Sequence, residues 1–251
     1  MRETWLLGKR AVAEIWKLPA ATLPTLFIPL FFLAVNIGQV SKTFPATTPF
    51  LHGQRYAAFQ LPVTLVFATS TATSGLALVT DIDLGYLDKL LLAPIRRSSI
   101  VLGRLMADFV RGVLVSLLVL ALGYAFGVRI KSGVGGAVLL VLLASLWGVA
   151  YAGFAQLIAL RTRNVQTTNA SFIIFFPLLF LTPNFVPFER LNEPMRSMAR
   201  ANPVSYIIVG LRSLVLEGWK PRQLVVCAAT ILVTASILTA ASLRTLRTYG
   251  D

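Results

Sequence analysis

Charged side chains gather in one short segment between two long apolar stretches. Residues 81–104, DIDLGYLDKLLLAPIRRSSIVLGR, bring three carboxylates close to four cations: Asp81, Asp83, Asp88, Lys89, Arg96, Arg97 and Arg104. The leucines at 84, 87 and 91 share one helical face, and Pro94 ends the helix. This pattern suits recognition rather than bond-making, because an amphipathic helix can insert into a groove of a soluble partner. The alternative is an ordinary connecting loop that rests on lipid.

The sequence offers no set of residues for enzymatic catalysis. An enzyme acting on lipids would need a nucleophile, an acid–base pair or a metal cluster, yet His52 and Cys227 are the only histidine and cysteine. They lie far apart in the sequence, one in a loop and the other in the last apolar run. The phosphate-binding pattern G-x-x-x-x-G-K-[ST] is also missing. We therefore expect a protein that is not an enzyme.

The composition predicts an all-α integral membrane protein with one transmembrane domain over 1–251. Hydrophobic residues make up 56% of the chain and the mean hydropathy is +0.76. Apolar runs of about 20 residues are long enough to cross a bilayer as helices, whereas barrel strands give shorter, weaker signals. Six transmembrane helices are expected at about 20–40, 57–79, 104–128, 134–160, 169–183 and 222–243.

The net charge of +13 is better explained by membrane topology than by nucleic-acid binding. Lysine and arginine collect on the cytoplasmic side of membrane spans. They are dense before the first span, between the second and third, after the fourth and after the sixth. Both termini are therefore expected in the cytoplasm, although the 184–221 connection, which would lie outside, also carries several arginines.

Two further segments are expected to be helical without spanning the membrane. Residues 1–18 place Trp5, Val12 and Trp16 on one arc and cations on the other, which predicts an interfacial helix rather than a plain charged tail. Within 184–221, Asn202 and Pro203 form a helix start, and Gly218 ends the apolar helix that follows. We expect a re-entrant hairpin in the outer leaflet, the alternative being a flat surface cap.

Polar and aromatic side chains inside the expected spans admit two interpretations. They could line a conduit for an amphipathic substrate, or they could serve close helix packing, which the sequence favours. The candidates for a substrate path are Thr64, Ser70, Thr71, Ser74, Phe172, Phe175 and Phe176.

Three motifs, taken together and in order, resemble the type-2 ABC exporter permeases, closest to the daunorubicin-resistance type that exports drugs and lipids. The first is DIDLGYLDKLLLAPIRR from Asp81. The second is RTRNVQ from Arg161, followed by an aromatic span and by Phe185 and Pro187. The third is NPVSY from Asn202, with Leu211 and Arg212 downstream. The resemblance covers nearly the whole chain, with departures at Leu84 and Asn184.

The resemblance implies a role for each motif. Residues 81–97 would be the cytoplasmic coupling segment that docks into a separate ABC ATPase, where ATP and magnesium would bind, with no cofactor in this chain. Residues 161–166 would add a smaller contact, and 184–221 would close the pathway outside. The implied coupling residues are Asp81, Asp83, Gly85, Tyr86, Leu87, Asp88, Leu91, Pro94, Arg96, Arg161, Arg163 and Asn164. The implied hairpin residues are Phe185, Pro187, Asn202, Pro203 and Arg212.

The expected function is that of the transmembrane subunit of an ATP-driven exporter in a prokaryotic plasma membrane. Its partners would be the ATPase, a second permease that is identical or paralogous, and membrane lipid, with no nucleic acid. The substrate would be amphipathic: a drug, a lipid or a glycolipid. An ion-driven transporter would need an ionisable carrier inside the membrane, and only Asp108, near Arg111, approaches this. A membrane anchor for a soluble partner is the other alternative.

Overall fold

The computed structural model describes the backbone of residues 2–17, 19–70 and 73–248, and their side chains except those of 2–3, 14–17, 19–26, 73 and 172. Throughout this part of the chain the regular structure is helical, with no strand. This confirms the expected all-α class.

Eleven α-helices and two 3₁₀ turns make up the regular structure of the described residues. In chain order these are α1 Arg2–Lys17, α2 Pro19–Val40, η1 Pro49–Leu51, α3 Tyr56–Thr69, α4 Thr73–Asp83, α5 Tyr86–Leu92, α6 Arg97–Ala125, α7 Gly133–Thr162, α8 Val165–Phe180, η2 Phe188–Arg190, α9 Met195–Ala201, α10 Pro203–Leu216 and α11 Pro221–Arg247.

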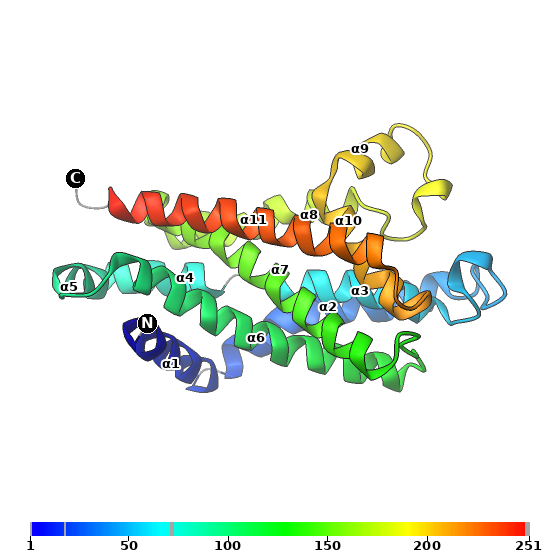
Figure 1. Cartoon of the computed structure of the whole chain (residues 1–251), viewed down its shortest axis with the longest axis horizontal. Coiled ribbons are helices and arrows are strands. Elements are labelled where there is room, and N and C mark those ends of the chain that lie inside the picture. The colour runs from blue at the N-terminus through cyan, green and yellow to red at the C-terminus, as the bar shows by residue number, and fades with distance from the viewer. Residues whose placement is uncertain (1, 18, 71–72, 249–251) are drawn as a thin grey trace.

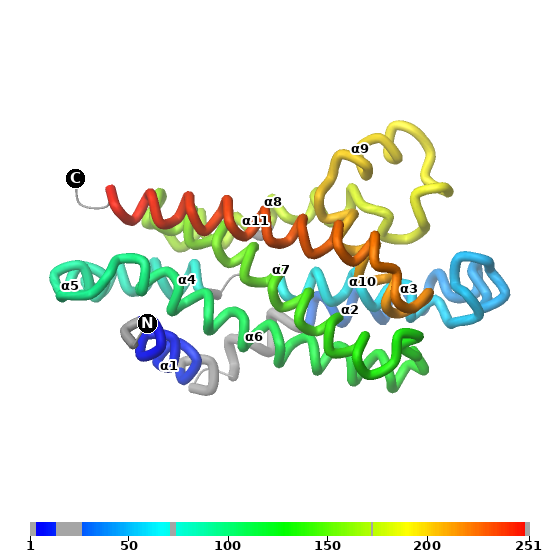
Figure 2. The backbone as a smooth tube through the Cα atoms, viewed as in Figure 1, coloured from blue at the N-terminus to red at the C-terminus, as the bar shows by residue number. Residues whose placement is uncertain are grey.

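The long helices lie roughly side by side, so the molecule has two ends (Figure 1). The first end, which we call the terminal end, holds α1, α5 and the end of α11. The connection after α2, the turn from α6 to α7 and the turn from α10 to α11 lie at the opposite end, and the trace in Figure 2 shows the same arrangement. The two ends of the described chain therefore lie on one side, as the charge pattern predicts.

Four stretches of the described residues are long and apolar enough to cross a membrane. They are Tyr56–Asp83, within which residues 71 and 72 are outside the described part, Arg97–Ala125, Gly133–Thr162 and Pro221–Arg247. Phe27–Val40 of α2, α8 and α10 are apolar but shorter. The structure thus supports a multi-pass membrane protein, and the number of six spans remains a prediction.

The helices pack closely around two groups of buried side chains. The larger group is built on α3, α7 and α10, where α3 is buried along its whole length. The smaller group joins α4, α5, α6, α7 and the end of α11 at the terminal end. Glycines allow the approach: a Cβ on Gly112 would lie 3.0 Å from the Cα of Ser145 on α7. Small residues at such crossings are typical of membrane helix packing.

Helix α1 covers Arg2–Lys17 within the segment expected to form an interfacial helix, and it is held against α6. It lies along α6, where a Cβ on Gly103 would come within 2.9 Å of the Leu7 Cβ. The hydroxyl of Thr4 also donates to that of Ser99, at 3.1 Å. Trp5 and Leu6 remain exposed, and their position at a membrane surface stays a prediction.

Candidate functional site

At the terminal end, α4 and α5 are two helices joined by a sharp turn, rather than the single helix expected from the leucine spacing. Helix α4 ends at Asp83, and Gly85 has a φ of +64°, the left-handed region that glycine enters without steric cost. Helix α5 then runs from Tyr86 to Leu92. Ala93 is extended, as expected for a residue before proline, so Pro94 ends the helix as predicted.

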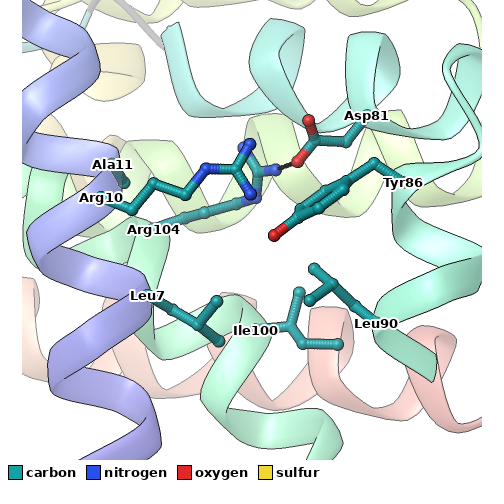
Figure 3. A pocket seen from close by; sticks show the side chains of 8 residues that line it. All are labelled: Leu7, Arg10, Ala11, Asp81, Tyr86, Leu90, Ile100 and Arg104. Atoms are coloured by element: carbon teal, nitrogen blue, oxygen red, sulfur yellow. Dashed lines mark hydrogen bonds and ion pairs between the residues drawn. The ribbon is translucent and has the colours of Figure 1, made fainter. Parts of the chain in front are cut away.

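Two cation contacts fasten this turn to the neighbouring helices. The guanidinium of Arg104 on α6 forms an ion pair and a hydrogen bond with the carboxylate of Asp81 on α4. The guanidinium of Arg10 on α1 lies over the Tyr86 ring, 4.1 Å from its centroid. Figure 3 shows both arginines reaching toward α4 and α5 above a small cavity of about 30 Å³, whose apolar side is formed by Leu7, Leu90 and Ile100. Such contacts hold α5 in one orientation.

The apolar face that the leucine spacing predicted does not point outward. The turn at Gly85 separates Leu84 from Leu87, and Leu87 is only 1% exposed because it packs into the smaller core group. Leu91 is half-buried against the same group. The outward-facing leucines are instead Leu84, 71% exposed, and Leu92, 87% exposed. In this conformation Leu87 is enclosed and Leu91 is half-buried, and their part in docking stays a prediction.

The polar residues of the segment divide in the same way. Asp83, Asp88, Lys89 and Arg96 are exposed, whereas Asp81 is half-buried. Among the exposed residues of the segment, we group Leu84, Asp88, Lys89 and Leu92 as the coupling surface. Asp81, Tyr86, Leu87 and Leu91 instead hold the segment in place.

The segment is also linked to the last helix. Arg97, at the start of α6, donates from Nη1 to the carbonyl oxygens of Leu246 and Arg247, at 3.3 and 2.7 Å. These carbonyls belong to the last turn of α11, where a cation is favoured by the helix dipole. A displacement of the segment would therefore be transmitted to α1, α6 and α11 together.

The second expected contact, 161–166, is an exposed turn between α7 and α8. Arg163 has a φ of +49°, and the Asn164 side chain caps α8 by accepting from the Thr167 N–H at 2.9 Å. Arg161, Arg163 and Asn164 are all exposed. Leu160, just before the turn, lies in the same buried group as Leu87, so both expected contacts belong to one end of the molecule.

The described polar residues of the expected substrate path are engaged in packing. Ser70 accepts a hydrogen bond from the Trp147 indole at 2.8 Å, and Ser74 accepts one from Gln156 at 3.2 Å. The Thr64 hydroxyl donates to a carbonyl of its own helix. All three are buried, which agrees with the packing interpretation. Thr71 and the side chain of Phe172 lie outside the described residues.

The phenylalanines of α8 are also used within the fold. Phe175 is 1% exposed and its ring lies 5.1 Å from that of Tyr151 on α7. Phe176 is half-buried and meets the rings of Phe67 on α3 and Phe32 on α2, at 5.4 and 6.3 Å between centroids. Both residues fill the space between helices in this conformation.

The 184–221 segment has the helix start and stop that the sequence predicts. The side chain of Asn202 accepts from the Val204 N–H and donates to the carbonyls of Leu178 and Leu181, so it caps the start of α10 and the end of α8 together. Pro203 is the first residue of α10, and Gly218, with φ +99°, follows its end. A shorter helix, α9 over Met195–Ala201, precedes it.

Helix α10 lies inside the bundle rather than on its surface. Six apolar residues along the helix are each at most 1% exposed: Val204, Ile207, Ile208, Leu211, Leu214 and Val215. Its last carbonyls are also satisfied, because Gln54 Nε2 donates to Val215 and the Ser132 hydroxyl donates to Leu214, both at 2.8 Å. A flat cap resting on the membrane surface therefore does not describe α10.

Arg212 is the polar centre of this buried helix. Its guanidinium donates to the carbonyl oxygens of Phe59 on α3 and Pro183, at 3.2 and 3.0 Å, and lies 3.5 Å from the Phe59 ring centroid. A buried cation needs such partners because it has lost its hydration. Arg212 thereby ties three segments together: α3, α10 and the linker after α8.

A small polar network, which the sequence did not reveal, extends this tie. Gln60 Nε2 donates to the Tyr56 hydroxyl and to the Asn184 carbonyl, at 2.8 and 3.1 Å. The Tyr56 hydroxyl donates in turn to the Phe185 carbonyl at 2.9 Å. The linker holding Phe185 and Pro187 is thus fixed mainly through its backbone. Only the occurrence of Gln60 in an otherwise apolar run could have signalled this network.

Asp108 is the residue that the sequence brings nearest to an ionisable carrier inside the membrane. It lies within α6, one turn from Arg111, and both residues are buried. The contrast with ion-driven carriers therefore cannot rest on the absence of a buried acidic residue.

These comparisons give one consistent result. Residues 2–216 match the family described as ABC-2 type transporter. The chain is 28% identical over 230 residues to the daunorubicin resistance ABC transporter permease protein DrrB1 of Streptomyces coeruleorubidus, covering 89% of this chain and 79% of the relative. It is 22% identical over 186 residues to the probable doxorubicin resistance ABC transporter permease protein DrrC of Mycobacterium tuberculosis, covering 69% and 67%.

A third relative fits the same pattern. The putative transport permease ycf38 of Cyanophora paradoxa is 24% identical over 221 residues, which cover 85% of this chain and 74% of the relative. The matched family region contains the coupling surface, the α7–α8 turn and α10. With its several membrane-length helices, this chain belongs to the ABC-2 type transporter family of multi-pass membrane permeases.

Proposed function

We propose that this chain is the transmembrane subunit of an ATP-driven exporter and that its coupling surface docks into a separate ATPase. The observation that carries the proposal is the exposure of Leu84, Asp88 and Leu92 on a segment fastened to α1, α6 and α11. Exposed apolar side chains beside charges are typical of a surface that binds a groove. Because these contacts hold the segment rigidly against three helices, a movement of the ATPase would be transmitted to them.

ATP and magnesium would bind to the ATPase, and this chain would respond to its movement. Binding of ATP can shift the permease only if the two conformations differ in their contacts with the ATPase. The coupling surface supplies a site for such contacts. The exposed turn Arg161–Asn164 would supply a second contact at the same end.

Transport would proceed between this chain and a second permease, identical or paralogous. The pathway would be closed at the end opposite the termini by α10 and the linker after α8. The contacts of Arg212, Asn202 and Gln60 support this role, since they join α3, α8 and α10 in one buried network. Opening would have to exchange these hydrogen bonds for others.

The substrate would be an amphipathic drug, lipid or glycolipid, and the membrane the prokaryotic plasma membrane with both termini cytoplasmic. Two relatives are named for resistance to daunorubicin and doxorubicin. The described side chains of the expected path are packed in this conformation, so substrate contact would require the helices to separate. The dense cations at the terminal end support the orientation.

The test is to reconstitute the permease with its ATPase in liposomes and to measure ATP hydrolysis against a panel of amphipathic drugs and lipids. Asp88→Arg should abolish both co-purification of the ATPase and substrate-stimulated hydrolysis. Glu189→Arg is the matched control, because it makes the same charge change at an exposed position away from the coupling surface. Retention of the ATPase by Asp88→Arg would contradict the proposed docking.

A further inference from the structure

A cavity at the end opposite the termini has no role in the function described above. Its volume is about 250 Å³. It lies among the end of α2, the connection that follows α2, the start of α3 and the residue after α6; that connection is light blue in Figure 1. Its lining includes Phe44, Ala46, Arg55, Tyr56 and Phe126.

The wall of this cavity is largely apolar. The Phe44 ring stacks on the Tyr56 ring, with 5.8 Å between centroids and 23° between planes. The Tyr56 hydroxyl is already used, because it donates to the Phe185 carbonyl. Tyr56 therefore adds ring surface rather than a free polar group. An apolar wall of this kind suits a hydrocarbon chain, which gains free energy by leaving water.

The rim of the cavity is positively charged. Arg55 is exposed, and its Nη1 lies 3.2 Å from the position a Cβ on Gly127 would occupy, so the guanidinium lies against the turn after α6. Arg55 also precedes α3, whose first turn receives no side-chain cap. The partial positive charge of that helix end adds to the charge of the guanidinium.

No carboxylate in the neighbouring loops opposes this charge. Residues 41–55 and 126–132 contain four cations, Lys42, Arg55, Arg129 and Lys131, and no aspartate or glutamate. Of these four cations only Arg55 lines the cavity, and no carboxylate of the two segments offsets its charge. An anion of the adjacent leaflet is the complementary partner.

We infer that the cavity binds an anionic phospholipid, with an acyl chain against Phe44, Tyr56 and Phe126 and the phosphate at Arg55. The lipid can enter from the bilayer, because Phe126 at the cavity and Tyr124 just before it are 43% and 51% exposed. The bound lipid would join the ends of α2, α3 and α6. The assignment depends on membrane insertion and not on the identity of the transported substrate.

Native mass spectrometry of the full chain tests the inference. The protein is reconstituted in nanodiscs containing equal amounts of phosphatidylglycerol and phosphatidylcholine, released, and analysed for the lipid that stays bound. Wild-type protein should retain one phosphatidylglycerol in clear excess over phosphatidylcholine. Arg55→Gln should lose that preference by removing the cation. Ala46→Phe should lose the bound lipid by filling the cavity from an exposed loop position.

Lys131→Gln is the matched control. It removes one exposed charge from the neighbouring loop but does not line the cavity, so it should keep the wild-type preference. Equal retention of the two lipids by wild-type protein would overturn the inference. So would an undiminished preference in Arg55→Gln, or displacement of the lipid by a cationic amphipathic drug.

Discussion

At the scale of single residues, two arginines anchor the two ends of the molecule by different means. Arg104 pairs with a carboxylate, Asp81, at the edge of the bundle, where both side chains keep 12–16% exposure. Arg212 instead relies on carbonyl oxygens and the Phe59 ring in the interior. The first contact is a charge pair and the second is the solvation of a buried cation by the backbone.

The Asp81–Arg104 pair should stabilise the coupling segment measurably. Asp81→Asn and Arg104→Gln should each lower the free energy of unfolding by about 1–3 kcal/mol, as expected for a hydrogen bond between charged groups. Chemical unfolding in detergent micelles provides the measurement. The double variant should cost less than the sum of the two single changes. Strict additivity would show that the two side chains do not interact.

Arg212 should matter more than any exposed arginine. Arg212→Met leaves the carbonyls of Phe59 and Pro183 without their donor, which should cost about 2–4 kcal/mol of unfolding free energy. Arg129→Met, at an exposed position, should change it by less than about 0.5 kcal/mol. Thermal unfolding of the two variants under the same conditions provides the comparison. Equal stability of Arg212→Met and Arg129→Met would refute the role given to Arg212.

At the scale of elements, the turn between α4 and α5 sets the direction of the coupling surface. The leucine spacing predicted a continuous helix with Leu84, Leu87 and Leu91 on one face, because spacing alone cannot reveal where the backbone leaves the helix. The left-handed conformation of Gly85 redirects α5, so Leu87 is buried and Leu84 and Leu92 are exposed. The glycine was the available signal, since it enters this conformation most readily.

The turn offers a test with an internal control. Gly85→Ala and Gly53→Ala both place a Cβ on a residue with positive φ and with open space around it. Each should cost about 1–2 kcal/mol for the left-handed conformation. Only Gly85→Ala should weaken the binding of the ATPase, because only that turn orients α5. Equal ATPase binding by both variants in a pull-down would argue against the role of the turn.

Helix α9 should respond to acid through a single carboxylate. Hydrogen bonds from the Ser197 hydroxyl and N–H, together with Arg196 and Arg200, hold the pKa of Glu193 below its ordinary value of 4.5. The ionised Glu193 carboxylate therefore stabilises the folded α9 fully above about pH 4.5. This stabilisation is lost as the pH falls through the lowered pKa. Hydrogen exchange over Met195–Ala201 should accelerate there relative to Glu193→Gln. If the hydrogen-exchange rates of wild-type protein and Glu193→Gln changed identically with pH, the effect would be excluded.

At the scale of the whole molecule, the sequence predicted local features better than their surroundings. The all-α class, the start of α10 at Asn202 and Pro203, and the end of α5 before Pro94 follow from residue types with strong local preferences, and the structure has them. The family, suggested by three motifs, is confirmed by the comparisons. These features depend on neighbours in the chain.

The features that the sequence did not reveal depend on contacts between distant segments. The spacing of its apolar residues gave α10 one apolar face, but not its enclosure by α3, α7 and α11. Likewise, Arg10 meets Tyr86 and Arg97 meets the end of α11 across long stretches of chain. No local pattern encodes such pairings. The roles of the coupling residues and of the expected hairpin remain predictions for experiment.

The most direct test is the affinity of the nanodisc-embedded permease for its ATPase, measured by surface plasmon resonance. Leu84→Ser combined with Leu92→Ser should raise the Kd at least about tenfold, a loss of about 1.4 kcal/mol, without lowering the unfolding temperature. Val134→Ser, equally exposed at the opposite end, should leave the Kd unchanged. A Kd that is the same for all three proteins would contradict the account, because the coupling surface would then not be where the ATPase binds.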